Sequence, residues 1–210
     1  MSRYSDSDPY LDPATGVLKN RLGITDESTL EQTEAALVST RSYELSEAPL
    51  KGHFDLPHLQ AIHRYLFGDL YEWAGELRNI DISKGGSLFA HHARIESAAG
   101  PIFQQLAKEN HIAGLGPEAF SERAAYYLGE LNALHPFREG NGRAQREFIS
   151  HLAHANGYYV AWENGTPAEL LAASIASFHG DASKLAGFIR RNLSALEQGG
   201  IARPRSRRDC

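Results

Sequence analysis

The amino-acid sequence predicts an all-α protein that contains one short β-hairpin. Seven segments carry apolar residues at the three- and four-residue spacing of a helix face, whereas one segment alternates apolar and polar residues around a Gly-Gly pair. The 210 residues are 42% apolar and 22% charged, which is ordinary for a globular protein. We therefore expect one domain over residues 26–198, an N-terminal extension at residues 1–25 and a basic, disordered tail at residues 199–210.

Three helices are predicted in the first half of the chain. The first covers residues 29–45 and follows three candidate capping residues, Thr25, Asp26 and Ser28. The second covers residues 56–70 and the third residues 94–110. The second helix places five apolar residues on one stripe that can face a core: Leu56, Leu59, Ile62, Leu66 and Phe67.

The segment IDISKGGSLFA, residues 80–90, breaks the helical pattern. A Gly-Gly pair between two short alternating runs is typical of a hairpin, although a plain loop fits the same residues. A lone hairpin is only marginally stable in water. If it forms, it must pack on the helices or serve to hold another molecule.

Four helices are predicted in the second half. One covers residues 117–134 and begins with Pro117, a residue favoured at the first helical position. The next opens at Gly140-Asn141-Gly142 and runs to a C-terminal cap at Gly157. The last two are expected at residues 166–178 and 184–196.

The charge balance argues against a general nucleic-acid-binding protein. Lys and Arg number 21 against 26 Asp and Glu, which gives a formal net charge of −5, whereas such proteins usually carry a basic surface. The exception is the C-terminal tail, which contains Arg203, Arg205, Arg207 and Arg208. Because the tail has few apolar residues to pack, a solvated end is a better interpretation than a phosphate-binding arm, and no direct nucleic-acid binding is expected.

Cysteine usage and hydropathy predict a cytoplasmic protein. The single cysteine, Cys210, excludes a disulfide within the chain and fits a reducing compartment. No run of about 18 apolar residues is present, so no membrane span is expected. The first residues, MSRYSDSDPYLD, are polar and do not resemble a secretory signal.

The stretch HPFREGNGRAQR, residues 135–146, concentrates groups that could act on a phosphate ester. Pro136 predicts that the preceding helix stops, which places His135 at a turn. The glycine-rich start of the next helix offers backbone N–H groups that have no acceptor within the helix and that favour an anion. Arg143 and Arg146 are three residues apart, so they leave one face of this helix and suit more than one phosphate group.

Two further side chains complete this predicted site. Glu139 could hold Mg²⁺, which proteins often bind through one or two carboxylates together with substrate phosphates. His135 is suited to take a proton near neutral pH. Together the residues predict a nucleotide–Mg²⁺ site where a hydroxyl is deprotonated and attacks a phosphorus. The alternative is that His135 caps a helix while Glu139 and the arginines form surface ion pairs.

The same stretch resembles Fic-domain proteins. HPFREGNGR matches in full their motif H-P-F-x-[D/E]-G-N-[G/K]-R, and Arg146 matches a second arginine of its extended form. Residues 56–90 are similar to the helix, the WAG-x-x-R turn and the hairpin of the family. The resemblance implies a compact Fic-type helical bundle whose hairpin is a flap over the active site. It also implies an enzyme that transfers AMP from ATP to a Ser, Thr or Tyr hydroxyl of a target protein.

The resemblance assigns roles residue by residue. It implies that His135 is the general base, that Glu139 holds Mg²⁺, and that Arg143 and Arg146 bind the β- and γ-phosphates. The anion hole is implied at Gly140, Asn141 and Gly142, with Asn141 also contacting phosphate. The flap residues expected to hold an extended target segment by strand addition are Ile82, Ser83, Lys84, Gly85, Gly86, Ser87, Leu88 and Phe89.

Gly142 bears on the choice of reaction. Relatives with Lys at this position are associated with phosphotransfer, so Gly142 favours AMP transfer. Transfer of phosphocholine from a cytidine donor stays open, because that branch of the family can share the motif. A nucleotide-binding interaction module with little activity is the remaining alternative.

The sequence lacks the inhibitory pattern [S/T]-x-x-x-E-[G/N] that many Fic proteins carry. Glu109, Glu139 and Glu163 are followed by Gly or Asn, but the residues four positions earlier are Gln105, His135 and Tyr159. The resemblance therefore implies a toxin inhibited in trans by a small antitoxin whose glutamate reaches Arg146. Several toxins of that branch modify DNA gyrase and topoisomerase IV, which makes these the implied targets.

Metal binding is not expected of the other histidines. His91-His92, and His151 with His154, could in principle act as ligands. No HExxH pattern or cysteine cluster accompanies them, so surface or packing roles are the better interpretation.

Overall fold

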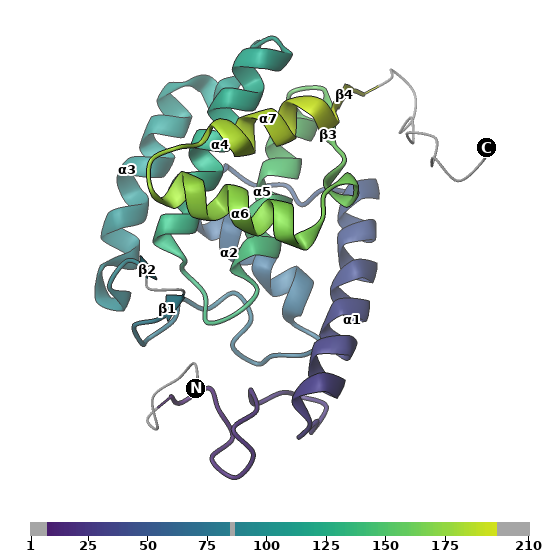
Figure 1. Ribbon diagram of the computed structural model, residues 1–210, viewed down its shortest axis with the longest axis vertical. Coiled ribbons are helices and arrows are strands. Elements are labelled where there is room, and N and C mark those ends of the chain that lie inside the picture. Colours follow the sequence, from purple (N-terminus) through teal and green to yellow (C-terminus); the bar gives the residue numbers. More distant parts are fainter. Residues whose placement is uncertain (1–7, 85–86, 197–210) are drawn as a thin grey trace, which may run out of the picture.

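The computed structural model describes residues 8–84 and 87–196 as a bundle of helices (Figure 1). Helices α4 (Pro117–Leu134) and α5 (Asn141–Ala155) lie at its centre, and α5 contacts α2 (Leu56–Phe67). Helices α6 (Pro167–Phe178) and α7 (Ser183–Asn192) cover α4 on the front in this view. Helices α3 (Ile95–Lys108) and α1 (Glu27–Glu47) flank the bundle on its left and right sides. The predicted all-α class is confirmed.

The helix boundaries follow local chemistry. Of the three candidate caps before α1, Asp26 is the one used, because its carboxylate accepts from the Thr29 N–H at 2.8 Å. Asp55 caps α2 in the same way, through the His58 N–H at 2.9 Å. The α2 and α3 helices end at Phe67 and Lys108, slightly before the predicted ends. Short 3₁₀ turns occupy His92–Arg94 (η1), Asn110–Ile112 (η2) and Trp162–Asn164 (η3).

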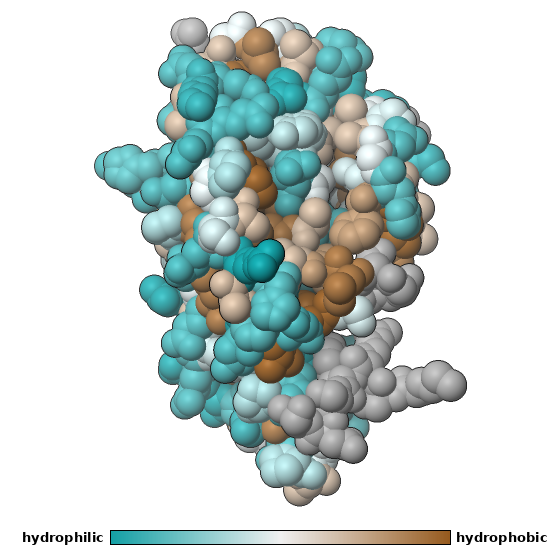
Figure 2. Space-filling model, turned by 90° about the vertical axis from the view of Figure 1, so that its left-hand side faces the viewer, coloured by the Kyte–Doolittle hydropathy of each residue, from teal (hydrophilic) through white to brown (hydrophobic). Residues whose placement is uncertain are grey.

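One hydrophobic core joins the helices to the stretch between α4 and α5. Its members from three helices and that loop include Leu59, Ile62, Phe120, Phe137, Phe148 and Ile149, all with 0% exposure. The motif loop, which we define as residues 135–140, is therefore anchored in the core through Phe137. Figure 2 shows the face on the left of Figure 1, where polar residues cover most of the surface and apolar residues gather toward the middle.

The predicted hairpin is present. Strand β1 (Ser83–Lys84) pairs antiparallel with β2 (Ser87–Leu88), and Ser83 lies opposite Leu88. The strands lie at the lower left of Figure 1. Gly85 and Gly86 lie outside the described residues, as do residues 1–7 and the predicted tail at residues 199–210. The loop alternative for residues 80–90 is thereby set aside.

A second small sheet was not predicted. Strand β3 (Tyr158–Val160) pairs antiparallel with β4 (Leu193–Ala195), so the prediction of a helix through residue 196 is wrong at its end. Backbone bonds from Ala161 N–H to Asn192 O and from Leu196 N–H to Gly157 O extend the pairing, at 2.9 and 2.8 Å. Pairing with a strand that is distant in sequence overrides the local preference for helix.

None of the helices within residues 8–84 and 87–196 is long and apolar enough to span a bilayer.

Candidate functional site

His135 ends α4 in a left-handed conformation, with φ 46° and ψ 62°. Its backbone N–H bonds to Leu131 O at 3.0 Å, and Pro136 prevents the helix from continuing. The predicted turn is therefore present. The ring Nδ1 lies 3.2 Å from Asn132 O. Because a carbonyl can only accept, Nδ1 carries the proton in this contact, which leaves the lone pair of a neutral imidazole on Nε2.

Arg78 ties the motif loop to the segment that carries the hairpin. Its Nε donates to His135 O at 2.8 Å, and its backbone N–H donates to Pro136 O at 2.9 Å. The same guanidinium donates to Ile80 O at 2.7 Å and to Ala90 O. Arg78 is only 2% exposed. The two ends of the hairpin segment are thus fixed to the backbone beside His135 by one buried side chain.

Asn141, the first residue of α5, holds the motif loop through its side-chain amide. Its Oδ1 accepts from the Phe137 N–H at 2.9 Å, and its Nδ2 donates to Phe137 O at 2.7 Å. The side chain is buried, and both ends of its amide are engaged. Its backbone N–H lies in the first turn of α5, where a helix offers no internal acceptor. Any contact of this residue with an anion is therefore better made through the backbone than through the amide.

His63, on α2, supports the loop from behind. Its Nδ1 accepts from the Gly75 N–H at 2.9 Å, so Nε2 carries the proton that is donated to Glu139 O, also at 2.9 Å. Burial lowers the pKa of His63 to about 3, with smaller lowering contributions from Arg143 and Arg64 and an opposing contribution from the bond to Glu139 O. His63 is therefore neutral near pH 7 and fixes the carbonyl of Glu139.

Gly140 is required by packing as well as by its conformation. It precedes α5 with φ 76°, a region that L side chains rarely adopt. A Cβ at this position would lie 2.3 Å from the ring of Phe67. The first turn of α5 can therefore approach α2 only with glycine here. Gly142 is less constrained, since a Cβ there would lie 3.4 Å from Arg146 Nη1.

The two predicted phosphate-binding arginines lie in different environments. Arg143 pairs with Glu34, a largely buried carboxylate on α1 that also accepts from the Tyr71 hydroxyl. Within residues 8–84 and 87–196, by contrast, no carboxylate forms an ion pair with Arg146. Burial and the neighbouring Arg143 lower the pKa of Arg146, while Glu147 opposes that shift. Arg146 is therefore a desolvated cation whose charge is poorly compensated.

Glu139 is the acidic group beside these arginines. Its Oε1 accepts from the Gly140 N–H at 3.0 Å and lies 3.9 Å from Arg143 Nη2, and the side chain is 41% exposed. An accessible carboxylate beside a helix N-terminus fits the ligand set of Mg²⁺, which keeps several waters and binds substrate phosphates. The residues present are thus compatible with a magnesium–nucleotide complex.

One cavity of about 1080 Å³ brings most of the predicted residues together. Its wall includes His135, Glu139, Asn141, Gly142, Arg143 and Arg146. Helices α1 and α6 form the opposite wall, with the half-exposed apolar side chains of Leu171 and Ile175 on α6. A volume of this size can take a nucleotide.

Among the described residues of the flap, residues 82–90, Phe89 lines this cavity. The ring of Phe89 stacks on His135 with centroids 3.8 Å apart and planes at 12°, and it meets Phe178 edge-on at 5.9 Å. Leu88 is 73% exposed. Ile82 precedes the pairing, the backbones of Ser83, Lys84 and Ser87 take part in it, and Gly85 and Gly86 lie outside the described residues.

Several residues at the site carry no local sequence signal. Arg138 lies within the motif but had no assigned role; it pairs with Asp8 at 2.7 Å, and both side chains are 1% exposed. Glu34 and His63 lie in ordinary helical stretches. Glu147, beside Arg146, is buried so that its pKa rises to about 7, although Arg146 lowers it. Arg138, Glu34 and His63 contact residues that are distant in the chain, and the shifted pKa of Glu147 arises only because the folded chain buries it.

Comparison with known proteins places the site in a family. Residues 53–153 match the Fic/DOC family. The chain is 40% identical over 192 residues to the probable protein adenylyltransferase Fic of Salmonella typhimurium, covering 91% of this chain and 94% of that protein. It is 52% identical over 195 residues to protein adenylyltransferase VbhT of Bartonella schoenbuchensis, covering 92% of this chain. It spans only 41% of the length of VbhT.

Solved structures agree with the fold. The BepC protein of Bartonella tribocorum, a VirB-translocated effector crystallised with bound AMPPNP, superposes with a TM-score of 0.85 and 28% identity. The match covers 90% of this chain and 97% of that one. An N-terminal Fic domain from Bartonella quintana with bound ADP also gives a TM-score of 0.85, at 27% identity, covering 90% of this chain and 96% of that one.

Proposed function

Because the chain belongs to the Fic/DOC family, we propose that it is a protein adenylyltransferase that moves AMP from ATP to a hydroxyl side chain of another protein. One observation carries the proposal. The imidazole of His135, the first turn of α5 and the poorly compensated Arg146 line the same cavity. A base and an anion site are thus within reach of one nucleotide. Relatives named as protein adenylyltransferases, and the AMPPNP and ADP of the neighbouring structures, support this assignment.

In the proposed reaction, His135 acts as the general base. Nε2 accepts the proton of the target hydroxyl, the hydroxyl oxygen forms a bond to the α-phosphorus, and the bond to the β-phosphate oxygen breaks so that pyrophosphate leaves. The contact of Nδ1 with Asn132 O supports this role, since it fixes the tautomer that has a lone pair on Nε2. Arg78 and Asn132 act as positioning residues through the backbone and ring of His135.

The phosphates would bind at the start of α5. The N–H groups of its first turn, with the backbone of Gly140, Asn141 and Gly142, form the anion hole, and Arg143 and Arg146 take the outer phosphates. Glu139 would hold Mg²⁺, which neutralises phosphate charge when bound. Gly142 favours AMP transfer over phosphotransfer, as the resemblance implies, because relatives with Lys at this position are associated with phosphotransfer.

The flap would receive the target protein. An exposed edge of two paired strands can accept an extended segment by strand addition, and the outward Leu88 offers apolar contact to it. Phe89 links that surface to His135 by stacking. A hydroxyl on a segment that docks here would approach the base.

The activity would be restrained by a separate antitoxin. Arg146 has no carboxylate partner within residues 8–84 and 87–196, and the sequence lacks the inhibitory glutamate pattern. A glutamate from a partner protein would pair with Arg146 and hinder the γ-phosphate. DNA gyrase and topoisomerase IV are the targets implied by resemblance, in a cytoplasmic toxin–antitoxin role.

The test is transfer of label from α-labelled ATP. We expect the purified chain, with Mg²⁺ and a bacterial lysate or purified gyrase, to label a protein band. His135→Ala should reduce the labelling rate at least about 100-fold, since general-base catalysis contributes about 10²–10⁴. ATP binding by His135→Ala, measured by calorimetry, should be retained. His53→Ala, which removes an exposed imidazole far from the motif in sequence, is the matched control and should label normally.

Other outcomes would distinguish the alternatives. Equal labelling by His135→Ala would contradict the proposed base. Label that appears only from γ-labelled ATP, or only from a cytidine donor, would assign a different transferase. ATP binding without labelling in any arm would favour a nucleotide-binding module.

A further inference from the structure

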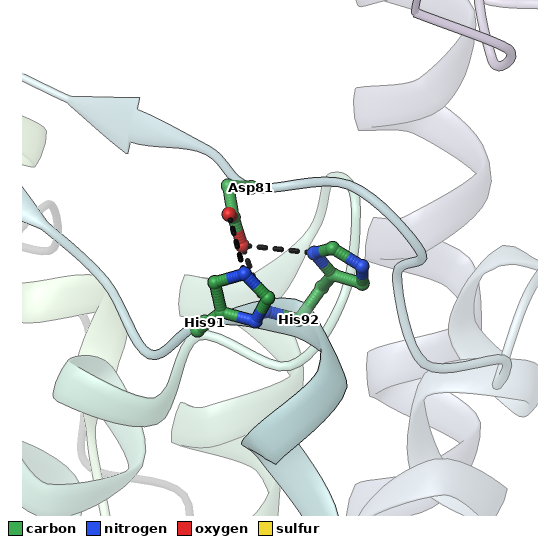
Figure 3. Close-up of side chains that lie close together, drawn as sticks. All are labelled: Asp81, His91 and His92. Atoms are coloured by element: carbon green, nitrogen blue, oxygen red, sulfur yellow. Dashed lines mark hydrogen bonds and ion pairs between the residues drawn. The ribbon is translucent and has the colours of Figure 1, made fainter.

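Three side chains converge outside the cavity, at the base of the flap. Asp81 directly precedes the flap, and His91 and His92 directly follow it (Figure 3). Asp81 Oδ2 lies 3.2 Å from His91 Nε2, and Asp81 Oδ1 lies 3.0 Å from His92 Nδ1. In Figure 3 the Asp81 carboxylate, on the segment that leads into β1, points at both rings. The three ligand-type atoms lie within 4.8 Å of one another.

These separations suit a tetrahedral metal ion. With metal–ligand bonds of about 2.0–2.1 Å, neighbouring ligand atoms on a tetrahedral ion lie about 3.3 Å apart. The two carboxylate–imidazole distances, 3.2 Å from Oδ2 to His91 and 3.0 Å from Oδ1 to His92, are close to this value but involve different oxygens. One ligand-type atom from each residue lies within 4.8 Å of the other two, so binding through a single oxygen requires the side chains to draw closer together. The two rings are already stacked, with centroids 4.5 Å apart and planes at 26°. Little reorganisation of the backbone is required to receive an ion.

The surroundings orient the carboxylate. The His92 N–H donates to Asp81 Oδ1 at 2.8 Å, which is the kind of supporting bond that fixes a metal ligand. These bonds to His92, together with the charge of His91, lower the pKa of Asp81, so that it is ionised at neutral pH. Two features oppose binding: Arg78 Nη1 lies 3.7 Å from Asp81 Oδ1, and His91 Nδ1 must give up the bond that it accepts from the Ala93 N–H at 3.2 Å.

We infer that Asp81, His91 and His92 form a binding site for a divalent transition-metal ion such as Zn²⁺, which closes the base of the flap. Imidazole ligands exclude Mg²⁺ and Ca²⁺ as the natural occupants, because those ions prefer oxygen. Three protein ligands leave a fourth position for water. The three side chains are 34% to 55% exposed, so an ion can reach them directly from solvent.

The ion would hold the two ends of the flap together. Residues 81 and 91 lie at opposite ends of the segment that carries Phe89, and next to this pair Arg78 already donates to Ile80 O and Ala90 O. A bound metal would add a second link between the two ends of the hairpin segment, besides the bonds from Arg78. The site itself does not depend on the proposed function, since its formation requires neither ATP nor a target; only an effect on target docking would.

The test titrates the nucleotide-free full chain with Zn²⁺ by calorimetry and with Co²⁺ by visible absorption. We expect one equivalent to bind, Co²⁺ to give the intense bands of a four-coordinate site, and hydrogen exchange within residues 82–90 to slow. His92→Ala and Asp81→Asn should each weaken Zn²⁺ binding at least about tenfold. His53→Ala, which removes another exposed histidine, should bind Zn²⁺ as the parent does.

Several results would overturn the inference. No stoichiometric binding in the parent would do so, and so would unchanged affinity in both His92→Ala and Asp81→Asn. A loss in His53→Ala equal to that in His92→Ala would place the ion elsewhere. Unfolding curves recorded without metal identify a variant that fails to fold. If either His92→Ala or Asp81→Asn does so, the Zn²⁺ affinity of the other variant decides the test. Since labelling with ATP is measured separately, failure here leaves the transferase proposal intact, and the reverse also holds.

Discussion

The motif loop and the flap face each other across His135, yet they are held in different ways. The motif loop is fixed by buried bonds from four directions: Asn141 from the start of α5, His63 from α2, Arg78 from the flap side and Asp8 from the N-terminal segment. The flap has two short strands and, at its base, a half-exposed cluster of one carboxylate and two imidazoles. Under the proposed function, the chemistry would take place on the more firmly bonded side and target contact on the more exposed side.

This difference is expected on physical grounds. A base and an anion hole must be preorganised to about half an ångström, which buried, fully bonded groups can provide. A surface that accepts an extended segment gains its bonds only when the partner arrives, so open edges are useful there. Free energy of unfolding should therefore respond strongly to changes behind the motif loop and weakly to changes in the flap.

The largest expected effect is at the buried ion pair behind the motif loop. Asp8→Asn leaves Arg138 buried without its carboxylate and should lower the free energy of unfolding by about 3–5 kcal/mol. The measurement is urea denaturation at pH 7. The matched control is Asp69→Asn, which breaks an exposed pair with Arg41 and should cost at most about 1 kcal/mol.

The Arg138 pair also allows a sharper version of this test. The double variant Asp8→Leu with Arg138→Met replaces both charges by apolar groups, and it should recover much of the loss because the two buried charges are removed together. Similar losses in Asp8→Asn and Asp69→Asn would contradict the claim that burial distinguishes the loop.

An intermediate effect is expected at Glu147, whose pKa rises to about 7 from 4.5 because burial disfavours its charged form. Between these pH values the folded state binds more protons than the unfolded state. The contribution of protonated Glu147 to the free energy of unfolding is therefore fully present below about pH 4.5 and is lost as pH rises through about 7. Glu147→Gln cannot ionise. Its stability relative to the parent should therefore increase from pH 5 to pH 8, by up to about 3 kcal/mol.

Urea unfolding at pH 5 and pH 8 measures this difference. Glu31→Gln, exposed on α1, is the control and should show no comparable change between the two pH values. A gain for Glu147→Gln that is the same at both pH values would mean that packing, not ionisation, is responsible.

The same contrast explains what the sequence could predict. The motif residues lie within twelve positions, so spacing alone predicted the turn at His135, the glycine-rich helix start and the cavity-facing arginines. The groups that hold them come from far along the chain: Glu34 is 109 residues from Arg143, and Asp8 is 130 residues from Arg138. No local pattern marks such partners, because only the folded chain brings them together.

Long-range pairing accounts for the other differences. Residues 193–195 were predicted as helix because their local pattern continues α7, but β3 captures them as a strand. His91 and His92 were interpreted as surface residues because no metal motif lies beside them. Their partner Asp81 is separated from them by the flap, so the cluster exists only once β1 and β2 pair.

The smallest effect on stability, and the clearest separation of roles, is expected within the flap. Phe89→Ala removes a partly buried ring from His135 and should lower the free energy of unfolding by about 1 kcal/mol. Leu88→Ala, at a side chain that is 73% exposed, should change it by less. Both losses in the free energy of unfolding should be smaller than the loss expected for Asp8→Asn.

The two flap variants should nevertheless differ in kinetics of AMP transfer. Phe89 contacts the base, so its loss should lower kcat as His135 becomes less well held, whereas Leu88 faces outward and its loss should raise KM for the target with little change in kcat. Steady-state labelling at varied target concentration separates these parameters. If both variants raised KM alone, the stack of Phe89 on His135 would serve only to shape the surface that binds the target. Phe89 would then belong functionally to the flap surface and would not help to position the imidazole.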